Sequence, residues 1–116
     1  MPPMNVSQAK RHVEEALNHT DLPAHAELHV QTSQNPGRLV LTMIVRNPGV
    51  TTGGNFIVSE EAIQDYGAQA VEDAFQRVLT AITNGNLLVL VGDPADLAVL
   101  TSHGWSDGHP APYAAH

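Results

Sequence analysis

The stretch Asn35-Pro-Gly-Arg-Leu-Val-Leu-Thr-Met-Ile-Val-Arg-Asn-Pro-Gly49 decides the fold, because two copies of one turn enclose a strongly β-prone run. In each Asn-Pro-Gly turn, proline presets φ and glycine supplies the positive φ that a type II turn requires at its third position. Residues 38–46 therefore form a strand that short connections join to one strand before it and one after it. Three consecutive strands are predicted.

The strand before the first turn alternates apolar and polar residues over 26–32, so Ala26, Leu28 and Val30 should point into the protein. The central strand, residues 39–45, carries bulky apolar groups at both its odd-numbered and its even-numbered positions, and therefore on both faces. Either it lies centrally in the sheet or both its faces are covered, and one cover could be a partner subunit. Met43 and Val45 are therefore candidate contact residues.

The third strand is expected at residues 55–58, after a loop at 50–54 whose paired glycines suggest mobility. Helices are predicted on both sides of the three strands. The first starts at Asn5 or Ser7 and ends near residue 18, where apolar residues recur at helical spacing. A second starts after Ser59 and bends or ends at Gly67, and the apolar spacing predicts a helix over 68–83.

Residues 87–91 form a short apolar run typical of a buried fourth strand. Asp93 and Pro94 then look like the cap and first position of a last helix that ends near His103. The order α-β-β-β-α-β-α predicts an α+β fold, a mainly antiparallel meander with helices packed on it. Residues 1–104 should form a single domain, and residues 105–116 an extended or disordered tail.

Composition excludes several classes of function. A formal charge of −7 disfavours binding to nucleic acid and to anionic lipid. The absence of cysteine excludes disulfides and thiolate chemistry. No membrane span or signal peptide is evident, so we expect a soluble protein made in the cytoplasm, with a virion as an alternative location. No cofactor is expected, because phosphate-binding, dinucleotide-binding, serine-hydrolase, zinc-protease and EF-hand signatures are all missing.

The chain has seven histidines, and their spacing suggests one candidate metal site. His12, Glu15 and His19 are spaced three and four apart, so they share a helical face on which two imidazoles and a carboxylate could bind zinc. His25 or His29 would have to complete the site. Solvent-exposed helix residues are the competing interpretation, and we favour it.

Two further patterns have weaker chemical readings. Asp93 and Asp96 lie where a strand is expected to meet a helix, a frequent place for catalytic carboxylates, but a capped helix start is the interpretation that we favour. Ser102 and His103 could suggest a nucleophile and base, but neighbours on a helix point about 100° apart.

The tail contains Trp105 and Tyr113, aromatic residues spaced by proline and glycine that could contact a partner groove; the alternative is that Trp105 packs as a C-terminal plug. We expect a non-catalytic interaction or assembly subunit, such as a viral or phage structural subunit, with a protein partner or a homo-oligomer. One alternative is an acidic inhibitor or immunity-type protein. Another is a small metal-dependent or acid-base enzyme that uses the His and Glu cluster.

Overall fold

A computed structural model describes residues 4–34, 37–84, 87–90 and 92–107 of the chain. The first helix, α1 (Val6–Asn18), begins where the sequence predicts. The Asn5 side chain accepts from the backbone N–H of Gln8, and the Gln8 side chain accepts from the backbone N–H of Asn5, which forms a complete capping box. Val6, Ala9 and Val13 form the buried stripe of this helix.

The three predicted strands are β1 (Ala26–Gln34), β2 (Gly37–Asn47) and β3 (Val50–Ser59). They pair as antiparallel neighbours, with Leu28 opposite Met43 and Leu41 opposite Phe56. Gly49 has the positive φ, +82°, that the second Asn-Pro-Gly turn requires. β2 lies inside the sheet between β1 and β3, which agrees with one of the two alternatives for this strand, and the inward-facing residues of β1 are confirmed.

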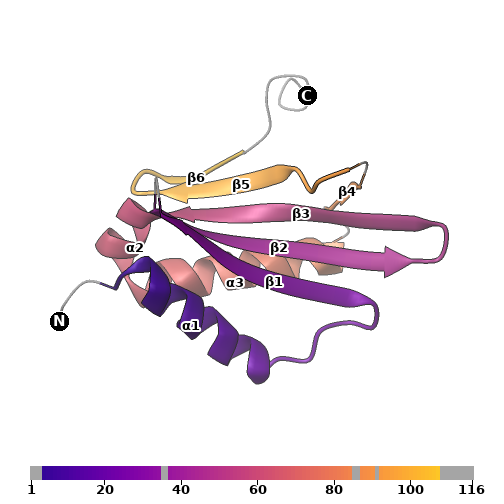
Figure 1. Cartoon of the computed structure of the whole chain (residues 1–116), viewed down its shortest axis with the longest axis horizontal. Helices are drawn as coiled ribbons and strands as arrows, with labels where there is room; N and C mark the ends of the chain where they lie inside the picture. Colours follow the sequence, from indigo (N-terminus) through magenta and orange to yellow (C-terminus); the bar gives the residue numbers. More distant parts are fainter. Residues whose placement is uncertain (1–3, 35–36, 85–86, 91, 108–116) are drawn as a thin grey trace.

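Two helices follow β3. The Ser59 hydroxyl caps α2 (Glu60–Tyr66), and Gly67, at φ +57°, separates it from α3 (Ala68–Asn84). The chain then returns as β4 (Leu88–Val89), β5 (Asp96–Thr101) and β6 (Gly104–Asp107). Within the described residues the sheet has the order β1-β2-β3-β5-β6, with β4 paired to one end of β3; the β3–β5 pair is parallel and the other pairs are antiparallel (Figure 1).

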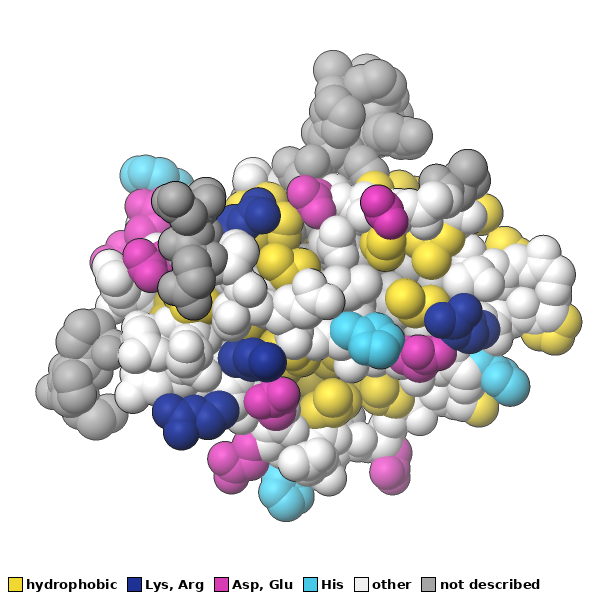
Figure 2. Space-filling model, in the orientation of Figure 1, with side chains coloured by type: hydrophobic (Ala, Val, Ile, Leu, Met, Phe, Trp, Pro, Cys, Tyr) yellow, Lys and Arg dark blue, Asp and Glu magenta, His cyan; other side chains and the backbone are white. Residues whose placement is uncertain are grey.

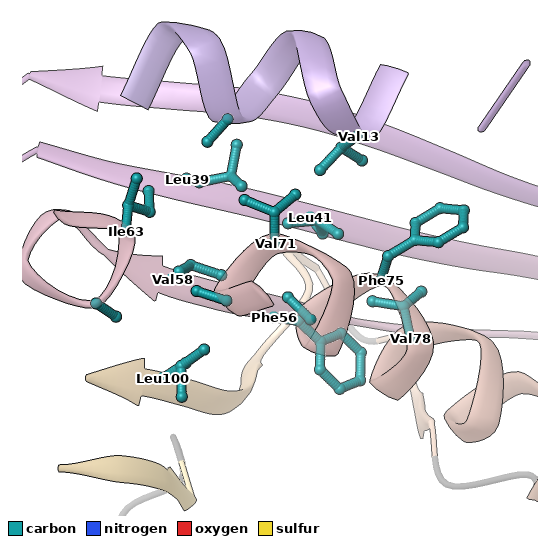
Figure 3. Packing of buried hydrophobic residues seen from close by; sticks show 14 of the residues in the cluster. Val13, Leu39, Leu41, Phe56, Val58, Ile63, Val71, Phe75, Val78 and Leu100 are labelled. Atoms are coloured by element: carbon teal, nitrogen blue, oxygen red, sulfur yellow. The ribbon is translucent and has the colours of Figure 1, made fainter. Parts of the chain in front are cut away.

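All three helices lie against one face of the sheet, and the core fills the space between the two layers. Leu39 and Leu41 of β2 and Val13, Ile63, Val71 and Val78 of the helices are completely or almost completely buried there, as Figure 3 shows. Aliphatic side chains dominate this interior, with Phe56 and Phe75 as its buried aromatic residues in the described part of the chain. The α+β class and the mainly antiparallel sheet with packed helices are confirmed.

The expectations for the segments after Asp93 and before Asn55 are wrong. The helix predicted after Asp93 does not form: the chain there builds β5 and then turns into β6. Residues 50–54 are not a mobile loop but the first half of β3. Trp105 belongs to β6, so regular structure continues past residue 104, while residues 108–116 lie outside the described part. Among the described residues, no helix has the length and hydrophobicity that crossing a membrane requires.

Candidate functional site

The face of the sheet that points away from α1, α2 and α3, here called the open face, carries the residues that alternate with the core. Directly opposed positions put Val40, Ile57 and Val99 side by side on β2, β3 and β5. Ile57 is only 4% exposed and yet does not belong to the core beneath the helices, because its neighbours on the open face shield it. Figure 2 shows hydrophobic side chains gathered on this face between charged ones.

A polar row crosses the same strands next to the apolar row. The Thr42 hydroxyl donates to Asn55 Oδ1 at 2.6 Å, and Asn55 Nδ2 donates to Asp96 Oδ1 at 3.0 Å and to the Pro94 carbonyl at 3.1 Å. Asn55 therefore uses both ends of its amide to join β2, β3 and the start of β5. The parallel strand β5 is positioned at this point, where the register shifts between Asn55 and Phe56.

An ionic cluster lies at the β1 end of the open face. Arg46 Nε donates to Glu27 Oε2 at 2.6 Å, and His29 Nε2 lies 3.2 Å from Glu27 Oε1. The hydrogen bond from Arg46, followed by that from His29, holds the pKa of the Glu27 carboxyl below its ordinary value. The cluster is exposed, so it fixes local charge positions and contributes little to stability.

Charge is distributed unevenly between the two sides of the protein. The open face carries Arg38 and Arg46 together with Glu27 and Asp96, and their formal charges cancel. The helices instead contain seven acidic side chains and three basic ones. The negative charge of the molecule is therefore concentrated on the helices rather than on the open face.

The structure places the predicted contact residues in different environments. Met43 is completely buried beneath the helices, and Val45 packs partly buried against the same core, so neither side chain lies on the open face. Trp105 is half-buried against the core, and the Arg77 guanidinium lies over its ring at 4.7 Å from the centroid. The plug interpretation accounts for this packing. Tyr113 lies outside the described residues.

The proposed metal triad does not come together. His12 and His19 border a groove of about 570 Å³ between α1 and α3. Glu15 does not border this groove, and it shares with His12 a shallow hollow on the outer side of α1. His29 is engaged with Glu27 on the open face. Throughout residues 4–34, 37–84, 87–90 and 92–107, no three His, Asp or Glu side chains are placed to hold a metal ion.

The remaining chemical candidates have structural partners. Asp96 accepts from Asn55 and does not sit at a helix end. Ser102 donates its hydroxyl to Glu61, and its carbonyl accepts from the Tyr66 hydroxyl at 2.6 Å, so these contacts fix the turn between β5 and β6 to α2. Ser102 and His103 lie in this turn. Among the hydrogen bonds of the described residues, none joins their two side chains.

Sequence reasoning did not single out Val40, Ile57 or Val99. The signal for them was that both the odd-numbered and the even-numbered residues of β2 are apolar. This pattern indicated a strand with two apolar faces, but it did not indicate which face the helices cover. The open face thus combines an apolar row, the Asn55 hydrogen bonds and balanced formal charges. Comparison of the chain with protein-family models, with curated proteins and with solved structures found no match.

Proposed function

We propose that this chain is a non-catalytic assembly subunit and that copies of it associate through the open face of the sheet. One observation carries the proposal: Val40, Ile57 and Val99 form an apolar row across three adjacent strands, on a face that no described helix covers. Apolar positions at the centre of an otherwise polar surface are typical of protein contact sites, because covering them removes hydrocarbon from water.

The charge distribution supports a second copy as the occupant. Two copies of a protein with formal charge −7 repel each other wherever their acidic surfaces meet. That repulsion is smallest at the open face, where Arg38 and Arg46 balance Glu27 and Asp96. An approach through the helices would instead bring two acidic surfaces together.

Light scattering after size exclusion tests the proposal. We expect the unchanged chain to form an oligomer. The double variant Val40→Lys/Val99→Lys adds two charges to the apolar row and should therefore be monomeric. The matched control, Gln76→Lys/Thr80→Lys, adds the same charge at exposed positions of α3 and should keep the oligomer. Circular dichroism verifies that both variants are folded. A monomer at every concentration, or equal behaviour of the two variants, contradicts the proposal.

The alternative function, an acidic inhibitor of a basic partner, is favoured by a different surface. Five exposed carboxylates lie along α2 and the start of α3, at Glu60, Glu61, Asp65, Glu72 and Asp73. A monomer that binds a basic protein with strong salt dependence would support this alternative. Association that is unaffected when Glu72 and Asp73 are replaced by glutamine and asparagine would remove it.

A further inference from the structure

Strand β1 forms one margin of the sheet along its whole length of nine residues. Its only strand partner in the described part of the chain is β2, and Figure 1 shows β1 at the margin of the sheet, next to α1. The opposite margin is β6, which has four residues. The two margins therefore differ in how much unpaired backbone they can offer to another strand.

The hydrogen-bonding phase of β1 shows which backbone groups face outward. Opposed residues of an antiparallel pair alternate between bonded and non-bonded positions. The Arg46 N–H donates to the His25 carbonyl at 2.9 Å, so alternation puts the odd-numbered residues of β1 in the bonded positions. The Ala26 N–H, in the other phase, donates to Pro23 instead of to β2. Leu28, Val30 and Thr32 therefore direct their N–H and C=O groups toward the outer edge.

The sequence of β1 lacks the residue types that commonly block an edge strand. Its sequence, Ala-Glu-Leu-His-Val-Gln-Thr-Ser-Gln, has no proline, lysine or arginine. Glu27 is its only formally charged residue, and Arg46 of the same chain holds that carboxylate at 2.6 Å. An incoming strand therefore meets a long edge on which the one formal charge is already paired.

We propose that two copies of this chain pair antiparallel through β1, so that their sheets become one continuous sheet across a two-fold axis. Full-length pairing of Ala26–Gln34 centres on Val30, which then lies opposite Val30 of the partner subunit, with His29 opposite Gln31 of the partner subunit. The inference shares with the proposed function only the premise that the chain is an assembly subunit. It concerns the edge of the sheet rather than its open face, and it supplies the second contact that an assembly of more than two copies needs.

The charges of α1 suit this arrangement. His12 and His19 of α1 face the groove toward α3, and Lys10 and Glu14 lie some 140–180° around the helix from them. Because α1 also packs on β1, Lys10 and Glu14 are on the flank toward the β1 edge. A two-fold axis reverses the direction of the partner's helix. With the middle of α1 near the axis, the basic-then-acidic order along the helix would bring Lys10 toward Glu14 of the partner subunit, which is an electrostatically complementary contact.

Charge substitutions at exposed residues of β1 test the pairing. His29→Glu/Gln31→Glu places glutamates opposite each other twice across the axis, and His29→Lys/Gln31→Lys does the same with lysines. We expect each variant alone to dimerise about tenfold more weakly than the unchanged chain, and an equimolar mixture of the two to recover the dimer mass. The neutral control His29→Gln should dimerise normally. Circular dichroism of each variant confirms its fold.

Amide hydrogen exchange of the unchanged chain supplies a second readout. The amides of Leu28, Val30 and Thr32 should become protected as the protein concentration rises, which a contact through the open face alone would not produce. An oligomer that resists both charged variants and leaves these amides unprotected overturns the edge pairing. Its dissociation by Val40→Lys/Val99→Lys would then leave the proposed function standing. A monomer under all conditions overturns both. Loss of the dimer only in the β1 variants, together with protection of these amides in the unchanged chain, keeps the edge pairing and rejects the open face.

Discussion

The guanidinium of Arg77 lies over the indole ring of Trp105, with Cζ 4.7 Å from the ring centroid. Arg77 belongs to α3 and Trp105 to β6, so the contact joins the last described strand to the helix layer. Trp105 is also opposite Leu100 of β5 and packs partly buried against the core. This aromatic residue therefore anchors the β5–β6 hairpin within the fold of the single chain.

Replacement of Arg77 by alanine should lower the free energy of unfolding by about 0.5–1 kcal/mol, the range of a cation–π contact at an exposed site. Trp105→Ala should cost more, about 2 kcal/mol, because half-buried apolar surface is lost as well. Urea unfolding of both single variants and the double variant gives their coupling energy. A coupling of zero would show that the stacked geometry contributes nothing to stability.

Gly54→Ala should destabilise the protein by about 1–3 kcal/mol, since a Cβ at this buried position of β3 overlaps the Leu97 side chain of β5. Truncation of Leu97 to alanine makes room for that Cβ. The double variant should therefore be more stable than the sum of the two single effects, as measured by thermal or urea unfolding. Strict additivity would mean that the overlap with Leu97 is not the source of the loss.

Asn55→Asp should destabilise the protein at neutral pH by about 1–3 kcal/mol, because the new carboxylate faces Asp96 and cannot donate to Pro94. Repulsion between the two carboxylates raises a pKa in the folded state above its unfolded value. The electrostatic part of the loss is therefore complete only above this raised folded pKa, and it has disappeared once the pH lies below the unfolded pKa. Asn55→Ala removes the hydrogen bonds without adding charge, so its stability loss should not vary with pH in this way.

The parts of the fold that depend on local chemistry could be predicted from the sequence. The Asn47-Pro48-Gly49 turn, the Asn5 cap and the Ser59 cap act on backbone groups within a few residues. Each makes one local conformation much more favourable than the others, whatever the rest of the chain does. The order of the first helix, the three strands and the following helices was predictable for this reason.

The C-terminal half of the fold depends on contacts that are distant in sequence. Asp93 followed by Pro94 has the composition of a helix start, and the short run 96–101 carries no periodicity that separates helix from strand. The free edge of β3 decides between them, because β5 can pair with residues 55–58 there. Gly53 and Gly54 looked like a loop for a related reason: the side chains of Leu90 and Leu97, which occupy the space beside them, come from far along the chain.

The candidate site was only partly predictable, because both the odd-numbered and the even-numbered residues of β2 are apolar. Leu39, Leu41 and Met43 point to the helices, while Val40 and Ile44 point away. No residue within the strand indicates which of its two faces the helices will cover. The sequence thus indicated a strand with two apolar faces and led to the choice of Met43 and Val45, which lie on the side that α1 and α3 cover.

Replacement of Glu27 by glutamine should separate an ionic contribution to stability from simple packing, because only the ionic contribution depends on pH. The hydrogen bond from Arg46 lowers the pKa of Glu27 in the folded protein, so ionised Glu27 stabilises the fold above its unfolded pKa of about 4.5. That contribution is lost as the pH falls through the lower, folded pKa. The unchanged chain should therefore be slightly more stable than the variant at pH 7 and low salt, and the two should converge in acid and at high salt. Urea unfolding over a range of pH measures the difference, and a difference that stays constant in acid would contradict an ionic origin.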